Sequence, residues 1–180
     1  MTERVALLLR GVNVGGVTVR SADLRSVLTD AGLGDVVTVL ASGNAVVTAT
    51  SASAAAKAAE AALEARYGRR IRVLGIAIDV LQEIVDAYPH GEDDDHTPYV
   101  VFELEPGVAK ELAALEPGEG EAIAEGDGVV HWANPKGTTL TSPFAKALER
   151  TAKDRVTTRN VRTLRKVLAA ARAGPLQPHC

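Results

Sequence analysis

The polar residues that follow the first apolar run have the chemistry of an anion site. Residues 5–9 are apolar at every position, and Arg10 follows them directly. A glycine-bearing loop then carries Asn13 and the pair Gly15 and Gly16. The planar guanidinium of arginine matches a phosphate or a carboxylate, and the backbone N–H groups of such a loop can form a nest for an anion. The stretch therefore predicts an anion site at the end of a buried strand.

Two further polar segments carry residue types suited to the same ligand. The sequence Ser-Gly-Asn at 42–44 separates two β-branched runs, and Thr-Arg-Asn occupies 158–160. With these segments, the predicted ligand-binding residues are Arg10, Asn13, Gly15, Gly16, Ser42, Asn44, Thr158, Arg159 and Asn160. Arg10 and Arg159 would be the ionic anchors, and the other residues would orient the ligand. The alternative is structural: the asparagines bond only nearby backbone, and Arg10 pairs with an acid or caps carbonyl groups.

The elements of the first 78 residues must bring the first two segments together. Apolar periodicity and turn residues predict strands at 5–9, 36–40, 45–49 and 71–78, with helices at 21–31 and 51–67. This βαββαβ order is typical of a ferredoxin-like half, whose antiparallel sheet has the strand order fourth, first, third, second. In that sheet the loop after the first strand and the hairpin at 42–44 lie at the same edge.

The remainder of the chain repeats this order in part. Residues 79–96 are predicted to form a short helix and an acidic linker, and residues 97–180 a second half with the order β-α-β-β-α. Its last strand is expected to be absent, with a basic helix in its place. The predicted fold class is thus α+β, with two tandem ferredoxin-like halves, the second ending in a helix instead of its last strand.

Three motifs give the chain a resemblance to a known family. The sequences LLLRGVNVGG, ASGNAVV and TTRNVRTLRKVL resemble the bacterial domain of unknown function DUF1697, in the same order along the chain. The resemblance implies two ferredoxin-like halves and places pattern residues at the predicted ligand-binding positions. It implies no activity. The chain departs from the pattern at Ala41, where a polar residue is usual, and at Val161, where an aromatic is usual.

Composition excludes several classes of protein. The net charge of −3 gives no global attraction to nucleic acid or to an anionic membrane, and 46% hydrophobic residues fit a globular chain. No run approaches the roughly 20 apolar residues of a membrane span, and no signal peptide is apparent. The single cysteine, Cys180, is the last residue, so no internal disulfide can form. We expect a cytoplasmic protein.

Other functions have weaker patterns. If residues 153–172 were helical throughout, Arg155, Arg159, Arg162 and Lys166 would form one basic stripe able to follow a nucleic-acid backbone; a solvated face explains the charges more simply. A protein-interaction module without catalysis is a further alternative.

The acidic linker contains residue types that bind metals but lacks the rigid spacing of metal ligands, so no metal and no cofactor is predicted. These residues are His90, Asp93, Asp94, Asp95 and His96. If the protein is an enzyme, electrostatic stabilisation by arginines is favoured over covalent catalysis, since Ser42 lies in no nucleophile elbow.

Overall fold

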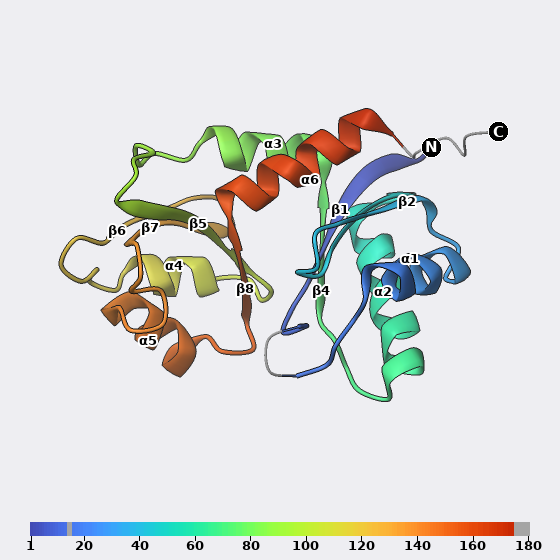
Figure 1. The fold of residues 1–180 in the computed structure, drawn as a ribbon, viewed down its shortest axis with the longest axis horizontal. Coiled ribbons are helices and arrows are strands. Elements are labelled where there is room, and N and C mark those ends of the chain that lie inside the picture. Colours follow the sequence, from blue (N-terminus) through green and yellow to red (C-terminus); the bar gives the residue numbers. More distant parts are fainter. Residues whose placement is uncertain (14–15, 175–180) are drawn as a thin grey trace. The chain divides into compact units, whose positions relative to one another are not determined.

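The computed structural model describes residues 1–13 and 16–174, and these form two compact units. The first unit comprises residues 1–82 together with the described residues from 165 onward, and the second comprises residues 83–164. The described part of the chain is an α+β fold with two four-stranded antiparallel sheets and six helices (Figure 1). The domain limits expected at residues 78 and 96 stay predictions from the sequence.

The first sheet has the strand order predicted for the first half. Its elements are β1 (Glu3–Leu9), α1 (Ser21–Asp30), β2 (Gly34–Val39), β3 (Asn44–Ala49), α2 (Ala52–Tyr67) and β4 (Val73–Ala77), with α3 (Ile78–Asp86) following. The order in the sheet is β2-β3-β1-β4, and each neighbouring pair is antiparallel. Strand β1 therefore lies in the middle, where Leu7 is opposite both Ala45 and Gly75.

Burial on both faces explains why β1 is apolar at successive positions. Val5, Leu7 and Leu9 belong to the core that includes Leu24 and Leu28 of α1 and residues of α2, so they point toward these helices. Ala6 and Leu8 point to the opposite face by strand alternation, and both are fully buried. The predicted doubly covered strand is confirmed.

Helix α2 lies directly against β4 because Gly75 has no side chain. A Cβ at Gly75 would lie 2.2 Å from the carbonyl oxygen of Ala52 in the first turn of α2. The helix is closed at both ends: Ser51 Oγ accepts a hydrogen bond from the N–H of Ala54, and Gly68 ends the helix in the left-handed conformation.

The second unit contains a sheet of the same order. Its elements are β5 (His96–Glu103), α4 (Val108–Ala113), β6 (Ala122–Glu125), β7 (Val129–Pro135), α5 (Pro143–Thr151) and β8 (Val156–Asn160). The strands are arranged β6-β7-β5-β8, again with antiparallel neighbours. Helix α6 (Val161–Ala173) follows β8 without a loop.

The prediction that the second half lacks its last strand is wrong. Strand β8 pairs with β5, with Thr158 opposite Val101 and Arg159 opposite Val100. Val156, Thr157 and Thr158 are β-branched, which favours an extended backbone. Two of the polar side chains of β8 are buried and bond each other, with Thr157 accepting from Arg159, and the sequence of the strand therefore lacks the apolar alternation that predicts a strand. The helix is present in addition to the strand.

The aromatic residues of the second unit form its core. The rings of Tyr99 and Trp132 stack with centroids 4.9 Å apart, and Trp132 also contacts Phe144 of α5. Glu121 accepts a hydrogen bond from Trp132 Nε1 at 3.1 Å and another from the N–H of Gly118 at 2.7 Å. Because Trp132 is only 2% exposed, this pair is part of the core and not a platform on which a base could stack.

Candidate functional site

The two polar loops of the first unit lie against each other. We call the described residues 10–13, 16–19 and 40–44 the anion loops, after the ligand class that the sequence predicts for them. The N–H of Leu9 donates to the carbonyl of Gly43 at 2.8 Å, and the side-chain amide of Asn13 donates to the carbonyl of Ala41. The cause is the strand order, since β1 ends beside the start of β3, with Leu8 opposite Asn44. The predicted proximity of these two segments is confirmed.

Gly43 is the point of closest approach between the anion loops. Its φ is +74°, in the left-handed region. A Cβ there would lie 2.4 Å from Val12 Cγ2 and 3.1 Å from Leu9 Cβ. Any side chain would therefore force the loops apart, as well as straining the backbone.

Asn13 holds the first of the anion loops in shape. Its φ is +60°, its Oδ1 accepts from the N–H of Val19 at 2.8 Å, and its Nδ2 donates to the carbonyl of Val19 at 3.1 Å. The same Nδ2 reaches Ala41 in the other loop. These bonds match the structural alternative considered for this residue, in which the amide serves nearby backbone.

Asn44 has a comparable role in the second loop. It is fully buried, and its Nδ2 donates to the carbonyl of Val39 at 3.1 Å and to Ser42 Oγ at 2.7 Å. Ser42 itself is exposed. Asn44 thus fixes the turn that presents Ser42.

The two asparagines together hold Leu40 in a strained conformation. Leu40 has a φ of +57° and is 46% exposed. Its neighbours Val39 and Ala41 have their carbonyls held by Asn44 and Asn13 respectively. A left-handed leucine costs about 1–2 kcal/mol, which the bonds on either side offset.

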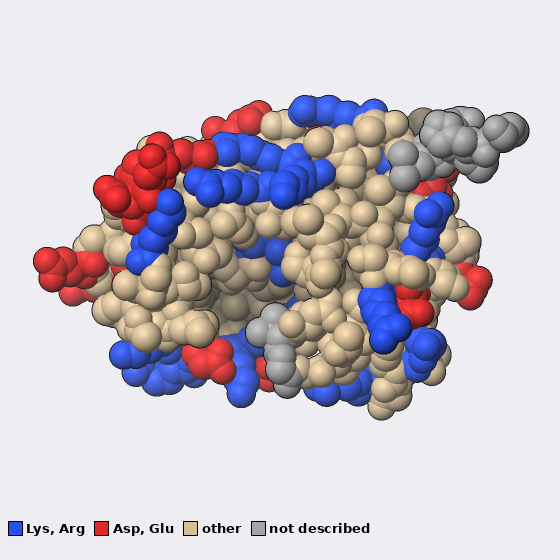
Figure 2. Space-filling model, in the orientation of Figure 1, with Lys and Arg blue, Asp and Glu red and all other residues tan. Residues whose placement is uncertain are grey.

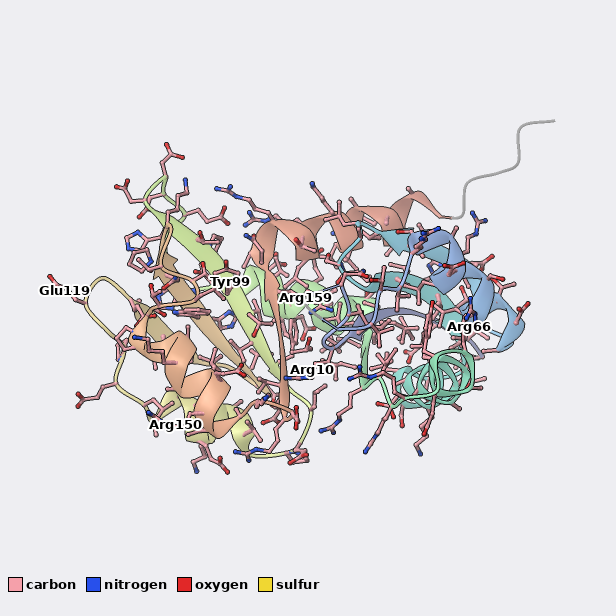
Figure 3. The ribbon with its side chains drawn as sticks, turned by 60° about the horizontal axis from the view of Figure 1, so that its bottom comes forward. Arg10, Arg66, Tyr99, Glu119, Arg150 and Arg159 are labelled. Atoms are coloured by element: carbon pink, nitrogen blue, oxygen red, sulfur yellow. The ribbon has the colours of Figure 1, made fainter. Side chains whose placement is uncertain are left out.

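Arg10 stands directly opposite a second arginine that sequence reasoning missed. Its N–H donates to the carbonyl of Arg72 at 2.9 Å, which extends the β1–β4 ladder by one position beyond the pair Leu9 and Val73. Both arginines are half-buried (Figure 3 labels Arg10). The signal in the sequence was the run Arg-Arg-Ile-Arg at 69–72, immediately before a strand that must lie beside β1.

The glycines of the first loop are only partly described. Gly16 is exposed, and Gly11 has a φ of +66° with nothing within 4 Å of the position of a Cβ. The predicted ligand-binding residue Gly15 lies outside the described residues. The two described glycines lie close together, since a Cβ at Gly16 would lie 3.4 Å from the carbonyl oxygen of Gly11.

The third predicted segment lies in the second unit. Arg159 on β8 is 8% exposed and donates from one guanidinium nitrogen to Thr157 Oγ1 at 2.8 Å and to the carbonyl of Thr158 at 3.0 Å (Figure 3). Burial lowers its pKa to about 10. Asn160 Oδ1 accepts from the N–H of Arg162 at 2.8 Å and so caps the start of α6. That these residues meet the ligand of Arg10 stays a prediction from the sequence.

The basic stripe, which was the less favoured alternative and required a continuous helix, does not form, because residues 156–160 are a strand. Arg155 precedes β8 and bonds Glu111 at 3.2 Å, while Arg159 is buried. On α6 the basic side chains are exposed, and Figure 2 shows Lys and Arg side chains gathered over this helix. They are Arg162, Arg165, Lys166 and Arg172.

The acidic linker is organised by an ion pair. Asp93 accepts from His96 Nδ1 at 3.0 Å, and the other ring nitrogen of His96 lies 2.9 Å from the carbonyl of Gly120. The bond to Asp93 raises the pKa of His96, and the same bond lowers the pKa of Asp93. Within residues 1–13 and 16–174, no three His, Cys, Asp or Glu side chains are grouped as metal ligands.

Comparison with solved structures supports the fold. The chain is similar to a structure described as that of conserved bacterial protein SP0830 from Streptococcus pneumoniae. The two share 22% sequence identity with a TM-score of 0.75, over 96% of this chain and 99% of that chain. At this identity the likeness concerns the fold alone.

Comparison with protein families then gives the family. The family described as "Protein of unknown function (DUF1697)" matches residues 1–132, so the chain belongs to it. The resemblance carried by the sequence motifs is therefore confirmed. No curated protein matches the chain. None of the described helices is both long enough and apolar enough to cross a membrane.

Proposed function

We propose that this protein binds a small anion, carrying a phosphate or carboxylate group, at the anion loops of its first unit. The observation that supports the proposal best is the fastening of the two loops by the Leu9–Gly43 and Asn13–Ala41 hydrogen bonds beside Arg10. A site held in place by internal bonds loses little conformational entropy when a ligand binds.

The loop residues divide into those that contact the anion and those that position the contacts. Arg10 is the ionic anchor, because its guanidinium can donate two parallel hydrogen bonds to two oxygens. Ser42 accepts a bond from Asn44, and its own O–H is then oriented to donate. The backbone N–H groups of the described glycines, Gly11 and Gly16, complete the donor set. Asn13 and Asn44 are positioning residues, since their amides bond backbone and Ser42.

The proposal is for binding and assigns no reaction. It also includes the finer fold assignment, in which each unit is ferredoxin-like. The βαββαβ order of each unit and its sheet order support that assignment.

Thermal unfolding of the full chain with added anions tests the proposal. Ligand at about 100 times its dissociation constant stabilises a protein by about 2.7 kcal/mol, which raises the melting temperature by roughly 5–10 °C for a chain of this size. We expect inorganic phosphate to have this effect on the wild type and to lose it in Arg10→Ala.

The matched control is Arg25→Ala. Arg25 is exposed on α1, so this variant removes the same charge from the helix side of the sheet. It should respond to phosphate as the wild type does. A wild type that is insensitive to every anion, or an Arg10→Ala variant that responds equally, would refute the proposal.

A further inference from the structure

We propose that His131 and the segment at residues 88–90 form a proton-sensitive latch in the second unit, closed at neutral pH and released in mild acid. The segment follows α3 and leads into the acidic linker before β5. The latch contains no residue of the anion loops, so it is independent of the proposed binding function. It depends on the contacts of a buried histidine with a tyrosine and a second histidine.

His131 is buried in β7, on the face of the sheet turned away from α4 and α5. Its neighbours Val130 and Trp132 belong to the core beneath these helices, so strand alternation puts His131 on the other face. Only 3% of the residue is exposed. A Cβ at Gly126 would lie 3.1 Å from Nε2, so the turn before β7 closes on the ring. In the described part of the chain, no hydrogen-bond partner reaches the buried Nδ1.

The segment is fastened to His131 and its neighbour by ring contacts and hydrogen bonds. The ring of Tyr88 meets the ring of His131 edge to face, with centroids 5.6 Å apart, and meets the ring of His90 in the same way at 5.4 Å. The Tyr88 hydroxyl donates to the carbonyl of Trp132 at 3.2 Å. His90 Nε2 lies 3.2 Å from the carbonyl of His131. All of these contacts are made by residues 131 and 132 of β7.

The groups around His131 oppose a proton on its ring. Burial, together with the positive charge that His90 can carry, lowers the pKa of His131. Arg159 is on the same face of the sheet, one strand beyond Val100, and strand spacing puts this second cation about 10 Å away. Val100 and Ala124, directly opposite His131 on the two neighbouring strands, carry no charge. A proton on Nδ1 would therefore add a buried positive charge without an acceptor, which is costly.

The carboxylates of the neighbouring segments leave the latch without an acid-sensitive partner for His131. Burial, and then the charges of Glu92 and Asp93, raise the pKa of Tyr88 to about 12. Tyr88 therefore keeps its proton throughout the range in which histidine titrates. In the turn between β6 and β7, the side chain of Asp127 is exposed. The proton-sensitive member of the contact with Tyr88 is then His131.

Acid favours release because water reaches the ring of His131 once the segment leaves β7. In the released state its pKa approaches the usual histidine value of about 6.5, and in the closed state it is lower. The latch is therefore fully stable above pH 6.5 and weakens as the pH falls from there through the lowered pKa. We expect release to be roughly tenfold more favourable at pH 5 than at pH 7.5.

NMR of the full chain between pH 7.5 and pH 5 tests the latch. The amide of Tyr88 donates to the carbonyl of Val85, so its hydrogen exchange, corrected for the intrinsic effect of pH, measures release. Cross-relaxation between the rings of Tyr88 and His131 measures their contact directly. We expect the protection of the Tyr88 amide to fall roughly tenfold, the ring contact to weaken over the same range, and His131 to titrate below 6.5.

Substitution of His131 removes the proton-sensitive group. In His131→Phe, which keeps a ring beside Tyr88, and in His131→Gln, which keeps a polar side chain, the protection of the Tyr88 amide should change less than twofold over this range. His96→Gln is the matched control, because His96 belongs to the same unit and bonds Asp93 instead of this cluster, and it should keep the wild-type pH dependence. Constant protection in the wild type, titration of His131 at 6.5 or above, or wild-type pH dependence in both His131 variants would overturn the proposal.

Discussion

The contact of Gly43 with Val12 and Leu9 predicts that Gly43→Ala separates the anion loops. Two costs add at this position. A left-handed alanine costs about 1–2 kcal/mol, of which the reduced entropy of the unfolded chain offsets about 0.4–1. The Cβ would also lie 2.4 Å from Val12 Cγ2, and relieving such overpacking typically costs about 1–3 kcal/mol more. We expect a total destabilisation of about 2–4 kcal/mol.

Gly68→Ala is the matched control. Gly68 has a φ of +69°, against +74° for Gly43, and nothing lies within 4 Å of the position of a Cβ. Only the strain of a left-handed alanine destabilises this variant, so we expect its free energy of unfolding to fall by about 1 kcal/mol. The difference between the two variants isolates the steric contact between the loops.

Urea unfolding, followed by circular dichroism, measures how far each substitution lowers the free energy of unfolding. Amide hydrogen exchange shows which part of the chain is destabilised. The N–H of Leu9 donates to Gly43, so its protection should fall in Gly43→Ala and persist in Gly68→Ala. If the two variants were equally stable and Leu9 equally protected, the reasoning about close approach would be refuted.

Two further predictions concern the second unit. Because its bond to Asp93 raises the pKa of His96, this pair stabilises the fold fully just below the usual histidine value of about 6.5 and ceases to do so as the pH rises through the raised pKa. At acid pH the stabilisation is lost again as the pH falls through the lowered pKa of Asp93. An NMR titration should therefore give His96 a pKa above 6.5 that returns toward it in Asp93→Asn; an unchanged value would contradict this. Glu121→Ala removes the hydrogen-bond partner of the buried indole N–H of Trp132. We expect this variant to lower the free energy of unfolding by about 2–4 kcal/mol and to shift the fluorescence of Trp132 to longer wavelength. Glu119→Ala, at an exposed position (Figure 3), should change stability by less than about 0.5 kcal/mol, and equal effects of the two substitutions would refute the role of Glu121.

The buried strands of the first unit could be predicted because their burial follows directly from residue type. An apolar residue at each position of 5–9 requires cover on both faces, and both faces of β1 are buried. The strand order then followed from the element order, and with it the contact between the anion loops. These predictions depended on the hydrophobic effect and chain connectivity alone.

The last strand of the second unit could not be predicted in the same way. Residues 156–160 read Val-Thr-Thr-Arg-Asn, and two of these polar residues, Thr157 and Arg159, are nevertheless buried. The apolar residues of this segment repeat with neither the period of two of a strand nor the period of 3.6 of a helix. The spacing of Arg155, Arg159, Arg162 and Lys166 matched one face of a helix instead. Pairing with β5 decided the conformation.

The roles of the polar residues depended on geometry that residue types do not contain. Asn13 and Asn44 suit either a ligand or a turn, and only their hydrogen bonds show that they hold Val19, Ala41 and Val39. Arg72 belongs to a run of charges that resembles a solvated surface. Strand register, which residue composition leaves open, puts it opposite Arg10.

The most direct test of the anion site is an amide NMR titration of the full chain with inorganic phosphate. The account predicts that the largest shift changes occur at Arg10, Gly11, Ser42 and Arg72, and that Arg10→Ala abolishes them. Shift changes spread over the exposed arginines of α6, or no saturable change at the anion loops, would contradict it.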